Sequence, residues 1–143
     1  VLDLYCGVGT LGLSVAKNEK MVYGIEIVSN AIKNAWDNAK LNNISNVKYY
    51  CGDVSKVISK IENKIDVIIT DPPRSGLDKK TIEVMMKLEP KEIIYISCDP
   101  ITLARDLKLL DGYSLKYITG LDMFSYTNHV ECVSVLYRKD LEK

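Results

Sequence analysis

The stretch VLDLYCGVGTLG, residues 1–12, decides the fold of this chain. Residues 1–5 are mostly apolar and predict a buried strand, residues 6–10 a turn that contains glycine, and residues 11–17 a helix. A strand, a G-x-G-x-x-G turn and a helix are typical of the first βα unit of a nucleotide-binding sheet. The glycines could otherwise serve only to make a tight turn, so a binding role needs support from residues beyond the turn.

Glu26 comes 19 residues after Gly7, at the end of the next predicted strand, residues 21–25. A carboxylate at this point can accept hydrogen bonds from ribose hydroxyls, and glycines let the backbone approach a ligand closely. We therefore predict that Gly7, Gly9 and Glu26 bind a cofactor that contains a ribose.

The rest of the chain continues the alternation of strands and helices. Helices are predicted over four more segments, residues 29–41, 53–61, 79–88 and 101–110. In the first of them, the helical spacing predicts one buried face formed by Ile32, Ala35, Trp36 and Ala39. Parallel strands are predicted over residues 47–51, 65–70 and 92–97, and an antiparallel hairpin over residues 114–119 and 132–137. The predicted fold is α/β: a Rossmann-like, doubly wound, seven-stranded, mostly parallel sheet with an antiparallel last strand.

The composition is that of a globular domain, with 143 residues of which 47% are hydrophobic and 27% charged. The 19 basic residues balance 19 acidic ones, so no overall charge attracts nucleic acid. The apolar runs are too short to cross a bilayer, and the widely spaced cysteines argue against a metal site or disulfides. We expect a cytoplasmic protein in which Cys6, Cys51 and Cys132 are core thiols. Because the chain starts on a strand without methionine, we expect a fragment of a longer protein.

Two polar segments come directly after neighbouring predicted strands. Residues 71–74, Asp-Pro-Pro-Arg, lie after the strand at 65–70, and residues 97–100, Ser-Cys-Asp-Pro, lie at the end of the strand at 92–97. Ligands bind at such carboxyl ends of strands in open α/β sheets. The lone thiol of Cys98 either packs in the hydrophobic core or acts as a nucleophile. Since residues 71–74 contain no nucleophile, Cys98 is the candidate nucleophile at these strand ends.

The spacing D-x-x-x-G-x-G from Asp3 to Gly9 resembles the first motif of S-adenosylmethionine-dependent methyltransferases. The predicted antiparallel last strand also distinguishes the class I methyltransferase sheet from the all-parallel dinucleotide-binding fold. The resemblance implies S-adenosylmethionine as the cofactor. It also implies that Asp53 contacts the adenine end, although Asp53 could equally be a plain N-cap of the helix at 53–61.

Four segments together resemble the RNA uracil-5-methyltransferases, which make 5-methyluridine in tRNA and rRNA; they are residues 3–9, 71–76, 97–100 and 129–133. They occur in the family's order and span nearly the whole chain. One departure is Asp99, where family members often have asparagine. The resemblance implies that residues 1–143 are one methyltransferase domain, and that RNA is bound mainly by an upstream region.

The resemblance implies that Cys98 is the nucleophile that adds to C6 of uracil, and that Glu131 is the base that removes the C5 proton. Glu131 could otherwise be a solvated residue at a strand end. The neighbouring His129 is expected to be loop structure or an RNA contact.

The resemblance also implies ligand contacts. Tyr5 and Thr10 would touch the cofactor, and Asp71 would orient the cofactor or the base. Arg74 would hold the substrate, although a surface salt bridge is an equally open interpretation. An adenine or other amino-methyltransferase, which would tolerate loss of Cys98, and a dinucleotide-binding domain remain the alternatives.

Overall fold

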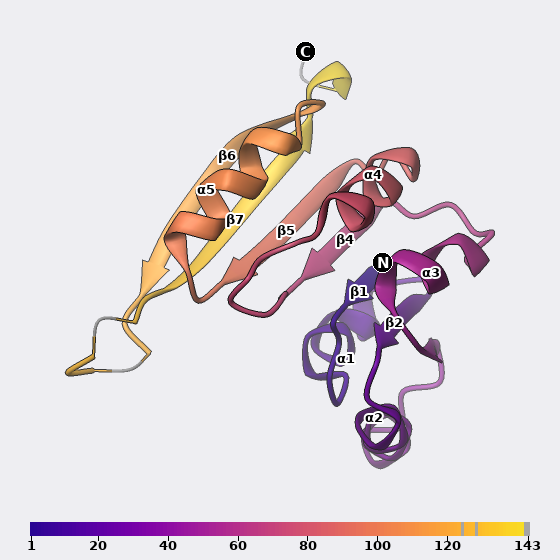
Figure 1. The fold of residues 1–143 in the computed structure, drawn as a ribbon. Helices are drawn as coiled ribbons and strands as arrows, with labels where there is room; N and C mark the ends of the chain where they lie inside the picture. The colour runs from indigo at the N-terminus through magenta and orange to yellow at the C-terminus, as the bar shows by residue number, and fades with distance from the viewer. Residues whose placement is uncertain (124, 128, 142–143) are drawn as a thin grey trace.

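A computed structural model describes residues 1–123, 125–127 and 129–141. Within these residues the chain forms one seven-stranded sheet, in the order β3-β2-β1-β4-β5-β7-β6 (Figure 1). The strands are β1 (Leu2–Leu4), β2 (Val22–Glu26), β3 (Val47–Cys51), β4 (Val67–Thr70), β5 (Glu92–Ser97), β6 (Tyr113–Leu121) and β7 (Glu131–Arg138). The pairings among β1 to β5 are parallel, whereas β7 runs antiparallel to both β5 and β6. The predicted fold class is therefore confirmed.

Helices cover both faces of the sheet. They are α1 (Thr10–Val15), α2 (Ser29–Leu41), α3 (Val54–Val57), α4 (Lys79–Lys87) and α5 (Pro100–Leu109), with short 3-10 turns at η1 (Ala16–Asn18), η2 (Ile58–Lys60) and η3 (Lys139–Leu141). The helices α4 and α5 lie on one face, in front of β4 to β7 in Figure 1. None of the helices in the described ranges is long and apolar enough to cross a membrane.

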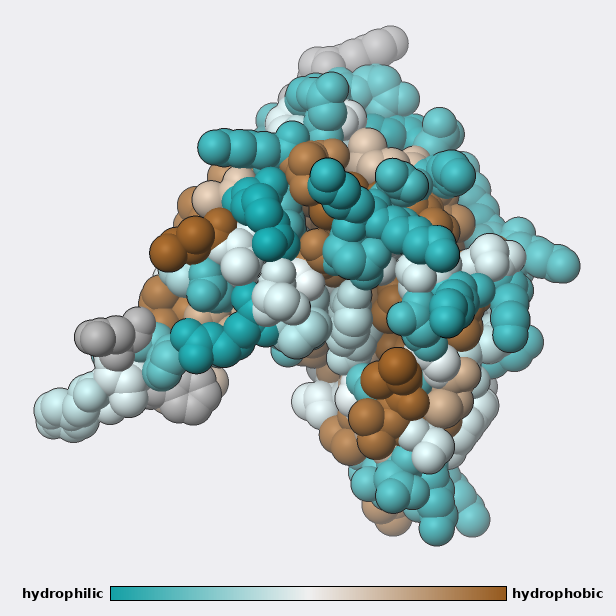
Figure 2. Space-filling view, viewed as in Figure 1, coloured by the Kyte–Doolittle hydropathy of each residue, from teal (hydrophilic) through white to brown (hydrophobic). Residues whose placement is uncertain are grey.

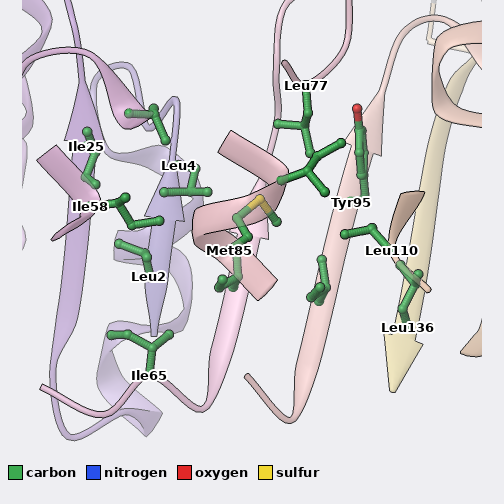
Figure 3. Packing of buried hydrophobic residues seen from close by; sticks show 14 of the residues in the cluster. Leu2, Leu4, Ile25, Ile58, Ile65, Leu77, Met85, Tyr95, Leu110 and Leu136 are labelled. Atoms are coloured by element: carbon green, nitrogen blue, oxygen red, sulfur yellow. The ribbon is translucent and has the colours of Figure 1, made fainter. Parts of the chain in front are cut away.

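The larger core cluster lies between the sheet and the helices α3, α4 and α5. Side chains alternate between the faces along β5, so Ile93 and Tyr95 are fully buried in this cluster. Figure 3 shows Tyr95 among its core neighbours. The interior strand β1 is buried at all of its residues, as expected for a parallel strand covered on both faces. This rigid centre fixes the strand ends at which the candidate site lies.

A second, smaller cluster packs α1 and α2 against the opposite face of β1, β2 and β3. The same face of β5 and β7 carries four half-buried aliphatic side chains that belong to neither cluster of the described residues: Ile94, Ile96, Val133 and Val135. We call these four residues the open half-face. Nothing in the described part of the chain buries it fully.

The structure corrects two predictions of burial. Trp36 is 45% exposed, because it lies at the edge of the apolar stripe of α2, where its ring packs edge-on against Tyr49. Cys51 is exposed, because it ends the edge strand β3, whereas Cys6 and Cys132 are buried as predicted. The helix predicted over residues 53–61 is only the single turn of α3 with η2 directly after it.

Candidate active site

The chain leaves β1 through a turn in which Tyr5, Gly7 and Gly9 have the left-handed φ values 60°, 54° and 83°. A Cβ atom on Gly9 would lie 2.6 Å from the Tyr49 hydroxyl oxygen, so position 9 has room only for glycine. A Cβ atom on Gly7 would meet nothing within 4 Å. The backbone at Gly7 is therefore open to a ligand, and the exposed Thr10 comes after the turn as the first residue of α1.

Glu26, the last residue of β2, ties this turn to the neighbouring strand. One carboxylate oxygen accepts a hydrogen bond from the Gly7 amide at 3.1 Å, and the other accepts one from the Val28 amide at 2.9 Å. Each oxygen keeps a further lone pair for a ligand. Glu26 is thus positioned beside the glycine turn, as the sequence predicts.

Asp53 lies just past the end of β3, the strand that pairs with β2. The Gly52 amide donates to the Glu26 carbonyl oxygen at 2.9 Å, which brings the two strand ends together. Asp53 occupies the N-cap position of α3 but makes no capping hydrogen bond, and its carboxylate accepts one from the Ser55 hydroxyl at 2.6 Å. The capping prediction is correct in position only, and the exposed carboxylate remains accessible to a ligand.

Asp3, for which no site role was predicted, is buried beside the glycine turn. It is 1% exposed; one carboxylate oxygen accepts a hydrogen bond from the Gly12 amide at 2.8 Å, and the other has no partner. The pKa of Asp3 is raised to about 7, chiefly by burial; the Gly12 hydrogen bond opposes this rise, and the negative charge of Asp71 adds to it. The available signal was an acidic residue four positions before the first glycine.

The side chain of Tyr5 points away from the glycine turn. Its ring packs against the larger core cluster, and its hydroxyl lies beside Thr81 of α4. Burial raises the pKa of this hydroxyl. A contact between Tyr5 and a ligand at the glycine turn would therefore involve its backbone.

The ends of β4, β5 and β7 bring three predicted residues together. Ser97 at the end of β5 pairs with Cys132 of β7, so Cys98 and Glu131 are the next residues outward on two adjacent strands. Cys98 is half-buried with a free thiol. The pKa of Asp71, just after β4, is raised by partial desolvation and by the negative charge of Glu131. A thiol and two carboxylates thus lie at the ends of three adjacent strands.

The turn after Cys98 is fixed by hydrogen bonds. One oxygen of Asp99 accepts from the amides of Ile101 at 2.9 Å and Thr102 at 3.0 Å, which caps α5. The amide bonds, chiefly that of Thr102, lower the pKa of Asp99, and the positive charge of Arg74 contributes. Arg74 is exposed and lies near this turn. Because asparagine caps helices as well as aspartate does, the departure at Asp99 keeps the same local structure.

The end of the sheet at which Asp71, Cys98 and Glu131 lie opens into a recess. Figure 2 shows the molecule hollowed between the projecting end of the β6–β7 hairpin and the lobe formed by α1 and α2. Another hollow, at the opposite edge of the sheet, is lined by residues that include Val1, Met21 and Asp66. Ligands bind at the carboxyl ends of strands in such sheets, so we assign the site to the first recess.

Among the described residues, no group of three or more His, Cys, Asp or Glu side chains could hold a metal ion. His129 is exposed, and its amide donates to the Thr127 hydroxyl at 3.2 Å in the β6–β7 loop. The predicted loop position of His129 is therefore confirmed.

A sequence model of the tRNA (uracil-5-)-methyltransferase family matches residues 1–139. The chain belongs to this family. Among its relatives, an uncharacterised RNA methyltransferase of Clostridium tetani is 48% identical over 142 residues, which cover 98% of this chain and 31% of that protein. One of Enterococcus faecalis is 45% identical over 141 residues, which cover 95% of this chain and 31% of that protein. This family member therefore spans less than a third of the length of these relatives.

A solved structure supports the assignment of this family member. The tRNA (uracil-54, C5)-methyltransferase of Pyrococcus abyssi, in complex with S-adenosyl-L-homocysteine, superposes with a TM-score of 0.85 and 38% identity. The match covers 94% of this chain and 33% of that one. TrmN from Thermus thermophilus, at 20% identity and a TM-score of 0.78, covers 96% of this chain and 43% of its own, and it shares the fold.

Proposed function

We propose that the full-length protein transfers a methyl group from S-adenosylmethionine to C5 of a uridine in tRNA or rRNA. The observation that carries this proposal is the pairing of Ser97 with Cys132, which makes Cys98 and Glu131 neighbours at the ends of adjacent strands. Membership of the tRNA (uracil-5-)-methyltransferase family supports the same reaction. A thiol and a carboxylate are the two groups that methylation of uracil at C5 requires.

The residues around the glycine turn fit S-adenosylmethionine. The open backbone at Gly7 suits the amino-acid part, and the carboxylates of Glu26 and Asp53 lie together at the strand ends where a ribose and an adenine would be bound. When bound, this cofactor supplies an electrophilic methyl group. The proposed cofactor-binding residues are Tyr5, Gly7, Gly9, Thr10, Glu26, Asp53 and Asp71.

Cys98 and Glu131 would act in turn, because C5 of uracil is a poor nucleophile. The Cys98 thiolate forms a bond to C6, and the electron pair of the C5–C6 double bond moves toward C5 and O4. After C5 has gained the methyl group, the Glu131 carboxylate removes the C5 proton, the double bond re-forms and the bond between C6 and sulfur breaks. Arg74, near the Cys98 turn, would hold the substrate.

The test is to incubate the full-length protein with S-adenosylmethionine and RNA that contains 5-fluorouridine. Fluorine at C5 cannot be removed as a proton is, so the adduct should persist through denaturing electrophoresis. We expect an adduct with the wild type and with Cys51→Ser, whose exposed thiol lies at a different strand end, and none with Cys98→Ala.

Either of two results would contradict the proposed function: no adduct with the wild type, or an adduct with Cys98→Ala. Methylation of adenine that survives in Cys98→Ala would favour the amino-methyltransferase alternative instead.

A further inference from the structure

A buried carboxylate outside the candidate active site joins the segments that form it. Asp106 of α5 is fully buried. One of its carboxylate oxygens accepts hydrogen bonds from the Leu77 amide and from the Tyr95 hydroxyl, both at 2.7 Å. Its other oxygen accepts from Nε of Arg105 at 2.8 Å. A single carboxylate thus links α5, β5 and the loop after β4.

The neighbouring Arg105 extends these contacts along the same loop. Its Nη2 atom lies 2.7 Å from the carboxylate of Asp106, and it donates to the carbonyl oxygens of Ser75 at 2.8 Å and Leu77 at 3.3 Å. The Thr102 hydroxyl donates to the carbonyl oxygen of Arg74 at 3.1 Å. The backbone from residue 74 to residue 77 is therefore fastened to α5.

Gly76 shows how closely the loop approaches Asp106. Its φ angle is +74°, and a Cβ atom there would collide with the Asp106 carboxylate and lie 2.6 Å from Nη2 of Arg105. The loop backbone rests directly on the buried carboxylate. A small displacement of Asp106 would therefore move the loop.

Tyr95 connects the same carboxylate to the nucleophile. Tyr95 is fully buried in β5, three residues before Cys98, and its hydroxyl oxygen points toward the end of the strand where Leu77 lies (Figure 3). Burial and the hydrogen bond to Asp106 raise the pKa of Tyr95, so the hydroxyl remains a donor. The loop that carries Arg74 and the strand β5, which ends just before Cys98, share this one acceptor.

We propose that Asp106 is a positioning residue, which sets the separation between residues 74–77, the part of the loop that carries Arg74, and the thiol of Cys98. This inference rests on the proposed function, because it is the substrate uracil that must lie between these two segments. Misplacing reacting groups by about 1 Å can cost on the order of 100-fold in rate. The hydrogen bonds of Asp106 go to Leu77, Tyr95 and Arg105 and reach neither Asp71 nor the glycines of the turn. Its effect should therefore be confined to the addition of the thiol to uracil.

The full-length Asp106→Asn variant tests this inference. An amide keeps one oxygen acceptor, so either the Leu77 and Tyr95 donors or the Arg105 guanidinium would face an NH₂ group. We expect adduct formation with 5-fluorouridine RNA, measured at saturating RNA, to slow roughly 10- to 100-fold. The dissociation constant for S-adenosylmethionine should stay unchanged. A general loss of structure would instead weaken cofactor binding as well as slow adduct formation. The matched control is Asp111→Asn, a fully exposed carboxylate just beyond α5, which should change neither quantity.

Tyr95→Phe provides a second variant, since it removes one donor and keeps the ring in the core. We expect a smaller slowing of adduct formation, again with unchanged cofactor affinity. A wild-type rate in Asp106→Asn overturns the inference, and if that variant does not fold, a wild-type rate in Tyr95→Phe overturns it. Absence of an adduct with the wild-type protein would instead refute the proposed function, and this inference with it.

Discussion

Asp3 and Glu26 lie on neighbouring strands, yet their surroundings give them different roles. Both oxygens of Glu26 accept backbone hydrogen bonds at a partly open position, whereas Asp3 is buried with one oxygen unpartnered. The sequence indicated both acidic residues. A buried strand is predicted over residues 1–5, but the unpartnered oxygen of Asp3 could not be deduced, because it depends on how β1 packs between β2 and β4 under α1.

The raised pKa of Asp3 predicts a dependence of stability on pH. Its carboxyl group titrates near pH 3.8 when unfolded and near pH 7 when folded. Between these values the unfolded chain has lost a proton that the folded chain keeps, so the free energy of unfolding should fall as pH rises. The slope is at most about 1.4 kcal/mol per pH unit for this one group.

Urea unfolding of the wild type and of Asp3→Asn, without cofactor, from pH 4 to pH 8 measures this contribution. We expect the difference in unfolding free energy between the two proteins to shift steadily in favour of the asparagine variant up to about pH 7 and then to level off. A difference that does not vary with pH would show that Asp3 is ionised normally.

The element boundaries differ in how well the sequence indicated them. The predicted bounds of α2, β3 and β5 match the structure, because each has a clear apolar pattern or a turn at its ends. The predicted helix over residues 53–61 was too long, since its apolar positions also suit a single turn continued by a 3-10 turn. Exposure of Cys51 depended on β3 being an edge strand, which pattern alone does not reveal.

The close packing of β2 predicts a steric effect at Gly24. A Cβ atom there would lie 2.5 Å from Cδ1 of Tyr49 and 2.9 Å from Sγ of Cys6, both in the smaller core cluster. We expect Gly24→Ala to reduce the free energy of unfolding by about 1–3 kcal/mol, the usual cost of overpacking.

Chemical unfolding measures this cost, with Gly112→Ala as the control. A Cβ atom at Gly112 would lie 3.1 Å from Cε of Met86, the mobile end of a flexible side chain that can turn aside. Its effect should be much smaller than that of Gly24→Ala. If Gly24→Ala cost as little free energy of unfolding as Gly112→Ala, the face of β2 would tolerate the extra methyl group and the prediction would be wrong.

At the scale of the whole molecule, the two sheet faces are covered unequally. One face is packed under α3, α4 and α5, while the open half-face leaves aliphatic side chains of β5 and β7 partly exposed. The alternation of strands and helices predicts helices on both faces of the sheet, but it does not assign each helix to its strands. Contiguous apolar surface of this kind promotes association.

We therefore expect residues 1–143, prepared alone, to self-associate at high concentration. Val135→Lys, a charge in the middle of the open half-face, should shift the sedimentation profile toward the monomer. Lys48→Glu, a charge reversal at an exposed position of β3, should not. A monomeric wild type at all concentrations would contradict this expectation.

RNA affinity is a second property of the whole molecule. The net charge of residues 1–143 is zero, and most binding to RNA depends on positive charge. We expect these residues alone to bind RNA weakly at physiological salt and the full-length protein to bind it more tightly. Fluorescence anisotropy with labelled tRNA measures both, and submicromolar binding by residues 1–143 would refute the expectation.

The antiparallel insertion of β7 beside β5 also makes the proposed chemistry depend on register. Cys98 and Glu131 are far apart in sequence, and only the Ser97–Cys132 pairing aligns them. Side chains alternate in direction along a strand, so a one-residue slip of β7 would turn Glu131 to the opposite face while leaving its chemical identity intact. Deletion of a single residue within β7 should therefore separate the Glu131 carboxylate from the Cys98 thiol as completely as substitution of Glu131 would. The length of this strand is thus a requirement of the proposed reaction.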